Sequence, residues 1–408
     1  MIQTQKSILA PFAYRDFRLL WSGLLISNLG TWMQFTAMGY FVAEMAQTPH
    51  RAALYLGFLG AARAIPVILL SPIAGVAADK LPRRRVLFIA NLVMALVALA
   101  LAVLITLGHL NIVGLVLLSA VNASAQSFDS PTRQSWVPLM VDRHLVGNAI
   151  GLNSVAFNAP AVIGPAIAGL LIVGVGVAGS FYINAVATLA VVVAVMFMRH
   201  VPPTSSVREP ILTSIRQGIM FIAGHGILKW IIGTFVVTAL FVRPYSTLLP
   251  AFAVNTLHAN ATGLGLAVAA AGIGGFGGAL VTAFIGQRDR RGTIWLTAGT
   301  IMSAGVFSLG LIWNLWIALP VLVTIGLATM SFMGASNTLI QTLSPDDVRG
   351  RVVSVYTMIA LGLVPGGSLI VGSIASLVGM HMGFILAGAT SLLVIAAMWF
   401  TKPILRTV

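Results

Sequence analysis

The sequence predicts an all-α membrane protein with twelve transmembrane helices, arranged as two pseudo-symmetric bundles of six. Of its 408 residues, 58% are hydrophobic and only 8% are charged, whereas a soluble domain carries about 25% charged residues. A bilayer crossing takes about 20 apolar residues, so the chain has room for about a dozen spans. Apolar runs fill most of this length, and the charged residues gather in the short segments between them.

The expected spans are apolar runs that end at charged or turn residues. The first bundle, 1–198, holds spans at 19–42, 54–77, 86–107, 112–127, 149–173 and 178–198. The second bundle, 227–408, holds spans at 227–253, 263–285, 294–312, 315–333, 352–378 and 383–400. The segment 199–226 contains prolines and serines and is predicted to be a cytoplasmic linker with a surface helix over 211–222.

The basic residues predict the orientation of the chain. A net charge of +14 and a pI near 11.3 would suggest nucleic-acid binding in a soluble chain, but in a membrane protein such residues mark the cytoplasmic loops. If the spans alternate from a cytoplasmic N-terminus, every Lys and Arg except Arg51, Arg63 and Arg243 falls on the cytoplasmic side. We therefore expect both termini in the cytoplasm and no nucleic-acid partner.

The chemistry-bearing residues do not suggest an enzyme. The chain has no cysteine, which rules out disulfides, thiolate metal sites and cysteine nucleophiles. The histidines fall near loops or helix ends, and neither a catalytic constellation nor a phosphate-binding glycine loop lies outside the expected spans. The residues before Arg18 show no cleavable signal peptide. We expect a non-enzymatic protein that needs no metal and no cofactor.

The loop after the second expected span carries a motif made of Gly75, Asp79 and three consecutive arginines that begin at Arg83. The motif resembles the Gly-x-x-x-Asp-Arg-x-Gly-Arg-Arg signature of the major facilitator superfamily, with Pro82 in place of the signature's glycine. The resemblance implies that Gly75 lets two helices pack closely and that Asp79 faces the positive end of a helix. Arg83 and Arg84 would pair with acids and latch the cytoplasmic side. A plain positive-inside anchor is the alternative, and it accounts for the arginines alone.

A weak internal repeat agrees with this resemblance. Residues 141–164 align with residues 344–367, and each segment leads from a charged loop into a helix that contains glycine and proline. Parallel repeats of this kind are the architecture of major facilitator transporters. The second-half counterpart of the signature, 286–292, is degenerate. The resemblance implies the major facilitator fold.

The end of the fourth expected span reads Phe-Asp-Ser-Pro-Thr-Arg over 128–133. This segment resembles the bacterial exporter branch of the superfamily, which includes enterobactin exporters and drug-efflux proteins. The resemblance implies that Asp129 and Arg133 are the ionic partners of Arg84 and Asp79. The alternative is an ordinary hydrated loop pair, which contributes little free energy.

The fifth expected span contains Pro160 and the pair Gly164-Pro165. It is similar to the Gly-Pro-x-x-Gly-Gly element that antiporters of the superfamily carry in this helix. Proline removes a backbone hydrogen bond and glycine permits close packing, so Gly164 and Pro165 would form a hinge between the halves. The resemblance favours antiport over uniport, although Gly and Pro are also common in membrane helices without such a role.

Two arginines fall inside expected spans, where a charge costs about 2.5 to 3.5 kcal/mol on insertion scales. Arg243 shortly precedes Tyr245 and Pro250, and the enterobactin exporters have a similar arginine before a Tyr-Pro-Ala element. Arg63 and Arg243 are expected to face a watery cavity that binds an anionic substrate, or else to be satisfied by backbone carbonyls or to snorkel to an interface. Glu44 is either a proton-coupling carboxylate paired with an arginine or an interfacial residue.

The resemblance implies a secondary active transporter of the bacterial plasma membrane that exports a small amphipathic, anionic compound by proton antiport with alternating access. Siderophore-like molecules and drugs are the expected substrates, protons and membrane lipids the expected partners, and a monomer the expected state. The alternatives are a lipid or lysolipid transporter of the same fold and a receptor without transport activity. In the family the first helix of each triplet lines the cavity, which nominates Asn28, Trp32, Gln34, Asn122, Gln126, Arg243, Tyr245, Ser331 and Asn337.

Overall fold

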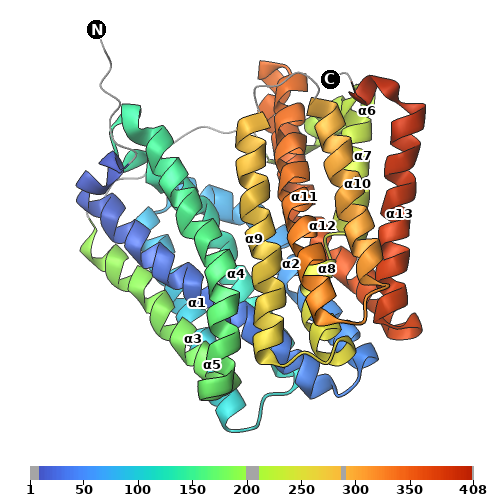
Figure 1. Ribbon diagram of the computed structural model, residues 1–408. Helices are drawn as coiled ribbons and strands as arrows, with labels where there is room; N and C mark the ends of the chain where they lie inside the picture. Colours follow the sequence, from blue (N-terminus) through green and yellow to red (C-terminus); the bar gives the residue numbers. More distant parts are fainter. Residues whose placement is uncertain (1–8, 199–210, 286–290, 407–408) are drawn as a thin grey trace. The chain divides into compact units, whose positions relative to one another are not determined.

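The computed structural model describes residues 9–198, 211–285 and 291–406, and nearly all of these residues are helical (Figure 1). The first long helices are α1 (Arg15–Ala46), α2 (Pro49–Lys80), α3 (Arg83–Thr106), α4 (Ile112–Trp136) and α5 (Val146–Phe197). They are followed by α6 (Ile211–Gly224), α7 (Leu228–Phe241), α8 (Tyr245–Ala251), α9 (Ala261–Ile285), α10 (Arg291–Leu309), α11 (Leu315–Leu343), α12 (Asp346–Val378) and α13 (Met380–Thr401). Short turns complete the set: η1 (Ala10–Ala13), η2 (Val137–Leu139), η3 (Arg143–Leu145), the π-helical η4 (Phe252–Thr256) and η5 (Pro403–Arg406).

The helices confirm an all-helical membrane fold. Among the described residues, ten helical segments are long and apolar enough to cross a bilayer. Helix α5, with 52 residues, contains the fifth and sixth expected spans, and Gly176 between them has a φ of 74° that interrupts the helix. Helix α1, with 32 residues, is also long enough to cross a bilayer, although its polar residues lower its mean hydropathy.

The seventh expected span is a broken helix made of α7, α8 and η4. The break lies at Arg243 and Pro244, where proline lacks the amide hydrogen that a continuous helix needs. The amide of Arg243 turns back to the carbonyl of Thr238 at 2.9 Å instead. Gly367 of α12 lies against the carbonyl of Leu240, so closely that a Cβ at this position would come within 2.3 Å of it. The break therefore depends on close packing by α12.

The chain divides into two compact units. The first consists of Met1–Ala37 and Pro66–Val207, and the second of Met38–Ile65 and Arg208–Val408. The end of α1 from Met38 onward and the part of α2 up to Ile65 thus belong to the second unit. The expected bundle boundaries, 1–198 and 227–408 with a linker at 199–226, stay a prediction; the helix expected over 211–222 is present as α6.

The first unit has a core that ties its first helix to residues far along the chain. Phe17, Leu20 and Leu24 of α1 are buried with Trp136 and other apolar side chains of α3, α5 and η2. The indole Nε1 of Trp21 donates to the carbonyl of Leu152 at 2.8 Å.

The preceding turn, η1, is packed against the same helix. Phe12 meets the ring of Trp21 edge-on, with ring centroids 4.9 Å apart. The side chain of Tyr14 hydrogen-bonds Asp142, and this bond raises the pKa of the tyrosine above its ordinary value of 10.0. The residues just before α1 are therefore held against the connection between α4 and α5.

In the second unit, glycines allow α9 and α11 to pack backbone against backbone. A Cβ on Gly274 would lie 1.9 Å from the carbonyl oxygen of Val323, and one on Gly326 would lie 2.0 Å from that of Ala271. Helix α11 also packs on α10, and α10 packs on α13, so these helices run alongside one another in Figure 1. Helix α6 joins α12 in the same way, with Gly218 against the carbonyl of Arg351.

The parts of α1 and α2 that belong to the second unit are held there by small residues and by a side chain that donates to a carbonyl. Gly39 of α1 lies against Pro250 of α8, and the amide of Asn255 donates to the carbonyl of Ala43 at 3.0 Å. Ala43 is in the last turn of α1, where carbonyls lack helical donors. In α2, Gly57 lies against the carbonyl of Ser368 of α12.

Candidate functional site

Arg243 is the charged residue with the most specific surroundings in the second unit. It lies between α7 and α8, at the helix break, and is partly buried. Its Nη1 donates to the carbonyl of Ala360 in α12 at 2.9 Å. Tyr245 and Tyr356 are the ionisable side chains that interact with it electrostatically. The position is expensive for a charge in a bilayer, and a single carbonyl bond leaves most of the five guanidinium donors for other partners.

A column of aromatic rings leads away from this arginine. The ring of Tyr356 lies 4.7 Å from that of Phe235, and Phe235 stacks on Phe332 at 5.9 Å. Phe332 in turn stacks on Trp295 at 5.6 Å. All four side chains are buried, so the column joins α12, α7, α11 and α10 as core. Its contribution to the site is to fix Tyr356 beside Arg243.

Tyr245 and Arg63 belong to the same unit as Arg243. Tyr245, which begins α8, is 6% exposed. Arg63, in α2, is partly buried. The bond from Arg243 to a backbone carbonyl corresponds to one of the alternatives given above for an intramembrane arginine. Tyr356 adds a polar group beside it that the sequence pattern did not indicate.

The nominated residues of α1 in the first unit serve largely in helix packing. Asn28 donates to the carbonyl of Ala156 at 2.9 Å. Gln34 is buried and accepts a hydrogen bond from the side-chain amide of Asn184. Trp32 covers Gly164, where an added Cβ would lie 2.8 Å from the Cβ of the tryptophan. The close packing expected of Gly164 is present, and the hinge expected of Gly164 and Pro165 stays a prediction.

The remaining nominated polar residues lie apart from Arg243 in sequence and differ in exposure. Asn122 and Gln126 are partly buried on α4, whereas Asn337 on α11 is exposed and accepts a hydrogen bond from the side chain of Gln341. Ser331 lines a small pocket between α9, α10 and α11.

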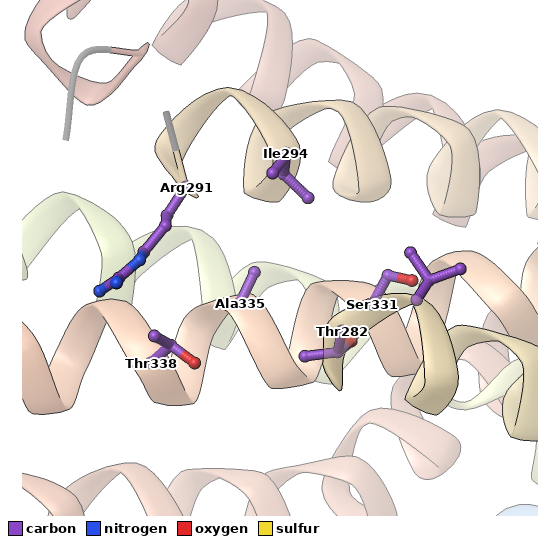
Figure 2. A pocket seen from close by; sticks show the side chains of 7 residues that line it. Thr282, Arg291, Ile294, Ser331, Ala335 and Thr338 are labelled. Atoms are coloured by element: carbon purple, nitrogen blue, oxygen red, sulfur yellow. The ribbon is translucent and has the colours of Figure 1, made fainter. Parts of the chain in front are cut away.

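Figure 2 shows this pocket, in which Arg291 extends beside Thr338 while Thr282 and Ser331 lie near each other. The hydroxyls of Thr282 and Ser331 both donate to the carbonyl of Gly278, at 2.8 and 3.4 Å. The hydroxyl of Thr338 donates to the carbonyl of Gly334 at 3.0 Å. These donors are committed to the helix backbone, and we do not assign the pocket to the substrate.

The charged cluster at the ends of α3 and α4 is paired differently from the expectation. Asp129 forms an ion pair with Arg133 of its own helix, at 3.2 Å, and accepts a hydrogen bond from Asn91 at 2.8 Å. Arg84 donates to the carbonyl of Met196 at 2.5 Å instead of pairing with Asp129. The expected pairing of Asp129 with Arg84 is wrong in this structure, because Arg133 lies one helical turn away on the same face.

The rest of the signature motif is only partly described. Arg83 is buried, and its Nε donates to the hydroxyl of Ser135 at 3.3 Å. The guanidinium of Arg133 also lies over the ring of Phe157, 4.3 Å from its centroid. For Gly75 and Asp79 the structure describes only the helical backbone, so the roles expected for these two residues stay predictions.

Glu44 has no arginine within ion-pair distance among the described residues, so the pairing with an arginine that was one expectation for it is absent there. Glu44 is exposed in the last turn of α1 and hydrogen-bonds the side chain of Tyr40, one turn earlier. Within the described residues the only ion pair is that of Arg133 with Asp129. No group of three or more His, Asp or Glu side chains suited to a metal occurs there either.

Several residues in these arrangements were not singled out from the sequence. Asn91, Asn184 and Tyr356 each place a polar group on a partner helix opposite a nominated residue. A polar residue in the middle of an apolar run is the signal that would have found Asn91 and Asn184. For Tyr356 no local signal exists, since its place beside Arg243 depends on the packing of α12 against α7.

Comparison with known proteins gives the class of this protein. Residues 6–407 match the family described as transmembrane secretion effector, within the major facilitator superfamily. Over 82% of this chain and 84% of the relative, the sequence is 27% identical to the multidrug efflux pump Tap of Mycolicibacterium fortuitum. It is 23% identical to the enterobactin exporter EntS of Citrobacter koseri, over 88% and 82% of the two chains, and 24% identical to the staphyloferrin A transporter of Staphylococcus aureus, over 95% and 97%.

Solved structures agree on the fold. The D-xylose–proton symporter superposes with a TM-score of 0.72 at 15% identity, covering 97% of this chain and 99% of that one. A bacterial homologue of the lysosomal transporter Spinster superposes with a TM-score of 0.71 at 14% identity, covering 96% and 98%. The chain is a major facilitator transporter and belongs to the transmembrane secretion effector family, whose efflux branch its relatives represent. It is a multi-span membrane transporter and not an enzyme, and the names of these relatives give no support to a lipid transporter.

Proposed function

We propose that this transporter exports a small amphipathic, anionic compound from the bacterial cytoplasm by proton antiport with alternating access. The observation that carries the proposal is Arg243, a cation at a helix break inside a membrane span, held beside Tyr245 and Tyr356. No described acid lies within ion-pair distance of it. A cation in such a place suits an anionic group of the substrate, because guanidinium binds carboxylates in two-point geometry.

The names of the relatives support export and indicate two candidate classes of substrate. Two of them are named for siderophores, enterobactin and staphyloferrin A, and one is named for multidrug efflux. Siderophores carry acidic oxygens that a guanidinium can bind, whereas a multidrug pump needs a mainly apolar cavity. The positive charge of Arg243 favours the siderophore class.

The membrane and orientation belong to the same proposal. The named relatives are bacterial, which supports the plasma membrane. The segregation of Lys and Arg supports cytoplasmic termini. Proton antiport is supported by the proline and glycine content of α5, in which Pro160, Gly164 and Pro165 are buried and Gly164 lies against Trp32 of α1.

Flux through purified protein in liposomes tests the proposal. Enterobactin, staphyloferrin A and a cationic dye serve as probes, with an inside-acid pH gradient, with none, and with a protonophore. We expect gradient-dependent movement of at least one siderophore, accompanied by proton movement in the opposite direction. Equal flux with and without the gradient would disprove antiport, and transport of the dye alone would disprove the anionic substrate.

A further inference from the structure

His381, the second residue of α13, is half-buried and lies against two aromatic rings at the start of the helix. Trp313 stacks on its imidazole with centroids 3.6 Å apart and planes at 30°. Phe252, the first residue of η4, meets the same ring edge-on at 5.6 Å and 79°. The packing is close on the remaining side too, since Gly310 lies against the backbone of His381 with no room for a Cβ. We call these three walls, Trp313, Phe252 and Gly310, the His381 cage.

The two ring nitrogens of His381 have different surroundings. Nδ1 lies 2.9 Å from the carbonyl oxygen of Gly310, and because a carbonyl can only accept, Nδ1 carries a proton. In the neutral ring Nε2 is therefore the unprotonated nitrogen. Nε2 is buried and has no hydrogen-bond partner among the described residues. A buried polar atom without a partner is rare and costs free energy.

Nothing described around the cage compensates a charge on the ring. On η4 and in the Trp313 segment, 310–314, no residue titrates, and α13 contains no other titratable residue. The charged residues of α10 and α12 lie at the opposite ends of those helices, and no described acid is within 4 Å of the ring. Two titratable neighbours have to be separated from His381. His258 lines a surface pocket together with Trp313, and His50 of α2 hydrogen-bonds the carbonyl of Ser376 in the last turn of α12.

We propose that His381 is a proton-binding site and that proton binding opens its cage on the Phe252 side. Imidazole ordinarily changes charge between pH 5 and 8. In the closed cage a proton on Nε2 would make this nitrogen a donor that has no acceptor among the described residues. The proton therefore binds better to a state in which water or an acceptor reaches Nε2, and by linkage it shifts the population toward that state.

The cage is asymmetric, which identifies the wall that moves. The face of Trp313 attracts an imidazolium, so stacking survives protonation. Phe252 lies farther from the imidazole, at 5.6 Å, and does not stack on it, so it is held less tightly and is the wall that moves. The N-terminus of α13 also disfavours the cation, which adds to the preference for a hydrated ring.

The Phe252 wall connects the proton to α1. Asn255, on the same π-helical turn, donates to the carbonyl of Ala43 at 3.0 Å. Turns of this kind are rare and often mark functional sites. Displacement of η4 from His381 would loosen the bond that holds the end of α1, so a proton taken up at His381 would favour release of this helix end. The link to transport rests on the proposed proton antiport, whereas proton binding and opening do not.

Trp313 reports on proton binding, because a protonated imidazole stacked on an indole quenches its fluorescence. The emission of Trp313 is the difference between the protein and its Trp313→Phe variant. We expect this difference to fall by about half between pH 8 and pH 5, as imidazole takes up a proton, and to become independent of pH in His381→Asn, whose amide can still donate to Gly310. If the pH dependence of the emission persists in His381→Asn and is lost in His258→Asn or in His50→Asn, the proton binds that other histidine and the proposed site is overturned.

Opening is measured separately by labelling a cysteine in place of the buried Ala43, since the native chain has none. Labelling by an impermeant maleimide is compared with that of His109→Cys, an exposed position, to correct for thiol ionisation. We expect the ratio to rise several-fold from pH 7.5 to pH 5.5, and to stay constant when His381→Asn is added. A constant ratio in both backgrounds would overturn the opening. If the labelling ratio rises at low pH while substrate flux in liposomes is independent of the pH gradient, the antiport proposal is wrong and the proton-binding site at His381 is retained.

Discussion

The side-chain amide of Asn28 donates to the carbonyl of Ala156, four residues before Pro160. In an uninterrupted helix this carbonyl would receive the amide hydrogen of residue 160, which proline lacks. Asn28 thus supplies from α1 the donor that α5 is missing. A residue nominated for the substrate is accounted for by the backbone chemistry of a neighbouring helix.

Replacement of Asn28 by Ala should therefore lower stability by about 1 to 3 kcal/mol, since it leaves a buried carbonyl without a partner. Thermal unfolding in detergent measures the change. Asn158→Ala is the matched control, because Asn158 is exposed and donates only to Ser154 of its own helix. Equal losses of stability in the two variants would show that the hydrogen bond from Asn28 to Ala156 contributes no more than the exposed bond from Asn158 to Ser154.

Arg243 should determine affinity for an anionic substrate. Arg243→Lys keeps the charge but loses two-point geometry, so we expect partial affinity, and Arg243→Ala should lose at least about ten-fold, the effect of one charge-assisted hydrogen bond of about 1.5 kcal/mol. Equilibrium binding of labelled substrate to purified protein is the measurement, with Arg85→Ala as a control at an exposed arginine. If Arg243→Ala binds the substrate with unchanged affinity, Arg243 has only the structural role of its hydrogen bond to Ala360.

Removal of Asp129 should destabilise the first unit. Asp129→Ala leaves Arg133, which is 5% exposed, without its anion, and breaking such a buried pair typically costs about 3 to 5 kcal/mol. Adding Arg133→Leu to Asp129→Ala should recover much of the loss. The protein, the two single variants Asp129→Ala and Arg133→Leu, and the double variant are compared by thermal unfolding, and additive losses in the double variant would contradict the coupling.

The contact of Tyr14 with Asp142 should be sensitive to alkaline pH. The pKa of Tyr14 is raised from 10.0 by its bond to Asp142, so the folded state holds the phenol proton more tightly than the unfolded state. The contribution to stability is complete below pH 10 and is lost as pH rises through the raised pKa. The melting temperatures of the protein and Tyr14→Phe should therefore differ at neutral pH and converge at strongly alkaline pH. A difference that grows with pH would refute this.

The orientation is tested by a single introduced cysteine. Ser205→Cys, in the expected cytoplasmic linker, should react with an impermeant maleimide only after cells are broken. His109→Cys, between α3 and α4, should react in intact cells. The reversed pattern would overturn the assignment of both termini to the cytoplasm.

The helices could be predicted from the sequence because apolar runs bounded by charges specify them with little dependence on context. Where the prediction was incomplete, the cause lies in contacts between helices that are far apart in the sequence. The seventh span was expected over 227–253, and the sequence analysis did not predict the break at Pro244, beside which Gly367 packs closely. The helix over 211–222 was anticipated, whereas its contact with Arg351 was not.

The candidate site could be predicted only in part. Arg243 stands out because a charge in an apolar run is costly, and the structure adds Tyr356 to it. Gln34 and Asn28 looked equally suited to a cavity, but their amides bond to α5. Polar residue type indicates that a side chain needs a partner in the membrane, and it does not say whether that partner is a ligand or another helix.

The bond between Trp21 and Leu152 has a consequence for biosynthesis. The two residues are 131 positions apart, so the ribosome has completed α2, α3 and α4 before the acceptor exists. Until then the indole N–H of Trp21 has no acceptor in Leu152, and the pair of rings formed by Phe12 and Trp21 has no residues of α5 to pack against. We expect α1 to be retained by the insertion machinery, or shielded by a chaperone, until α5 is synthesised. Chains truncated before residue 152 should then be degraded faster than chains that end after α5.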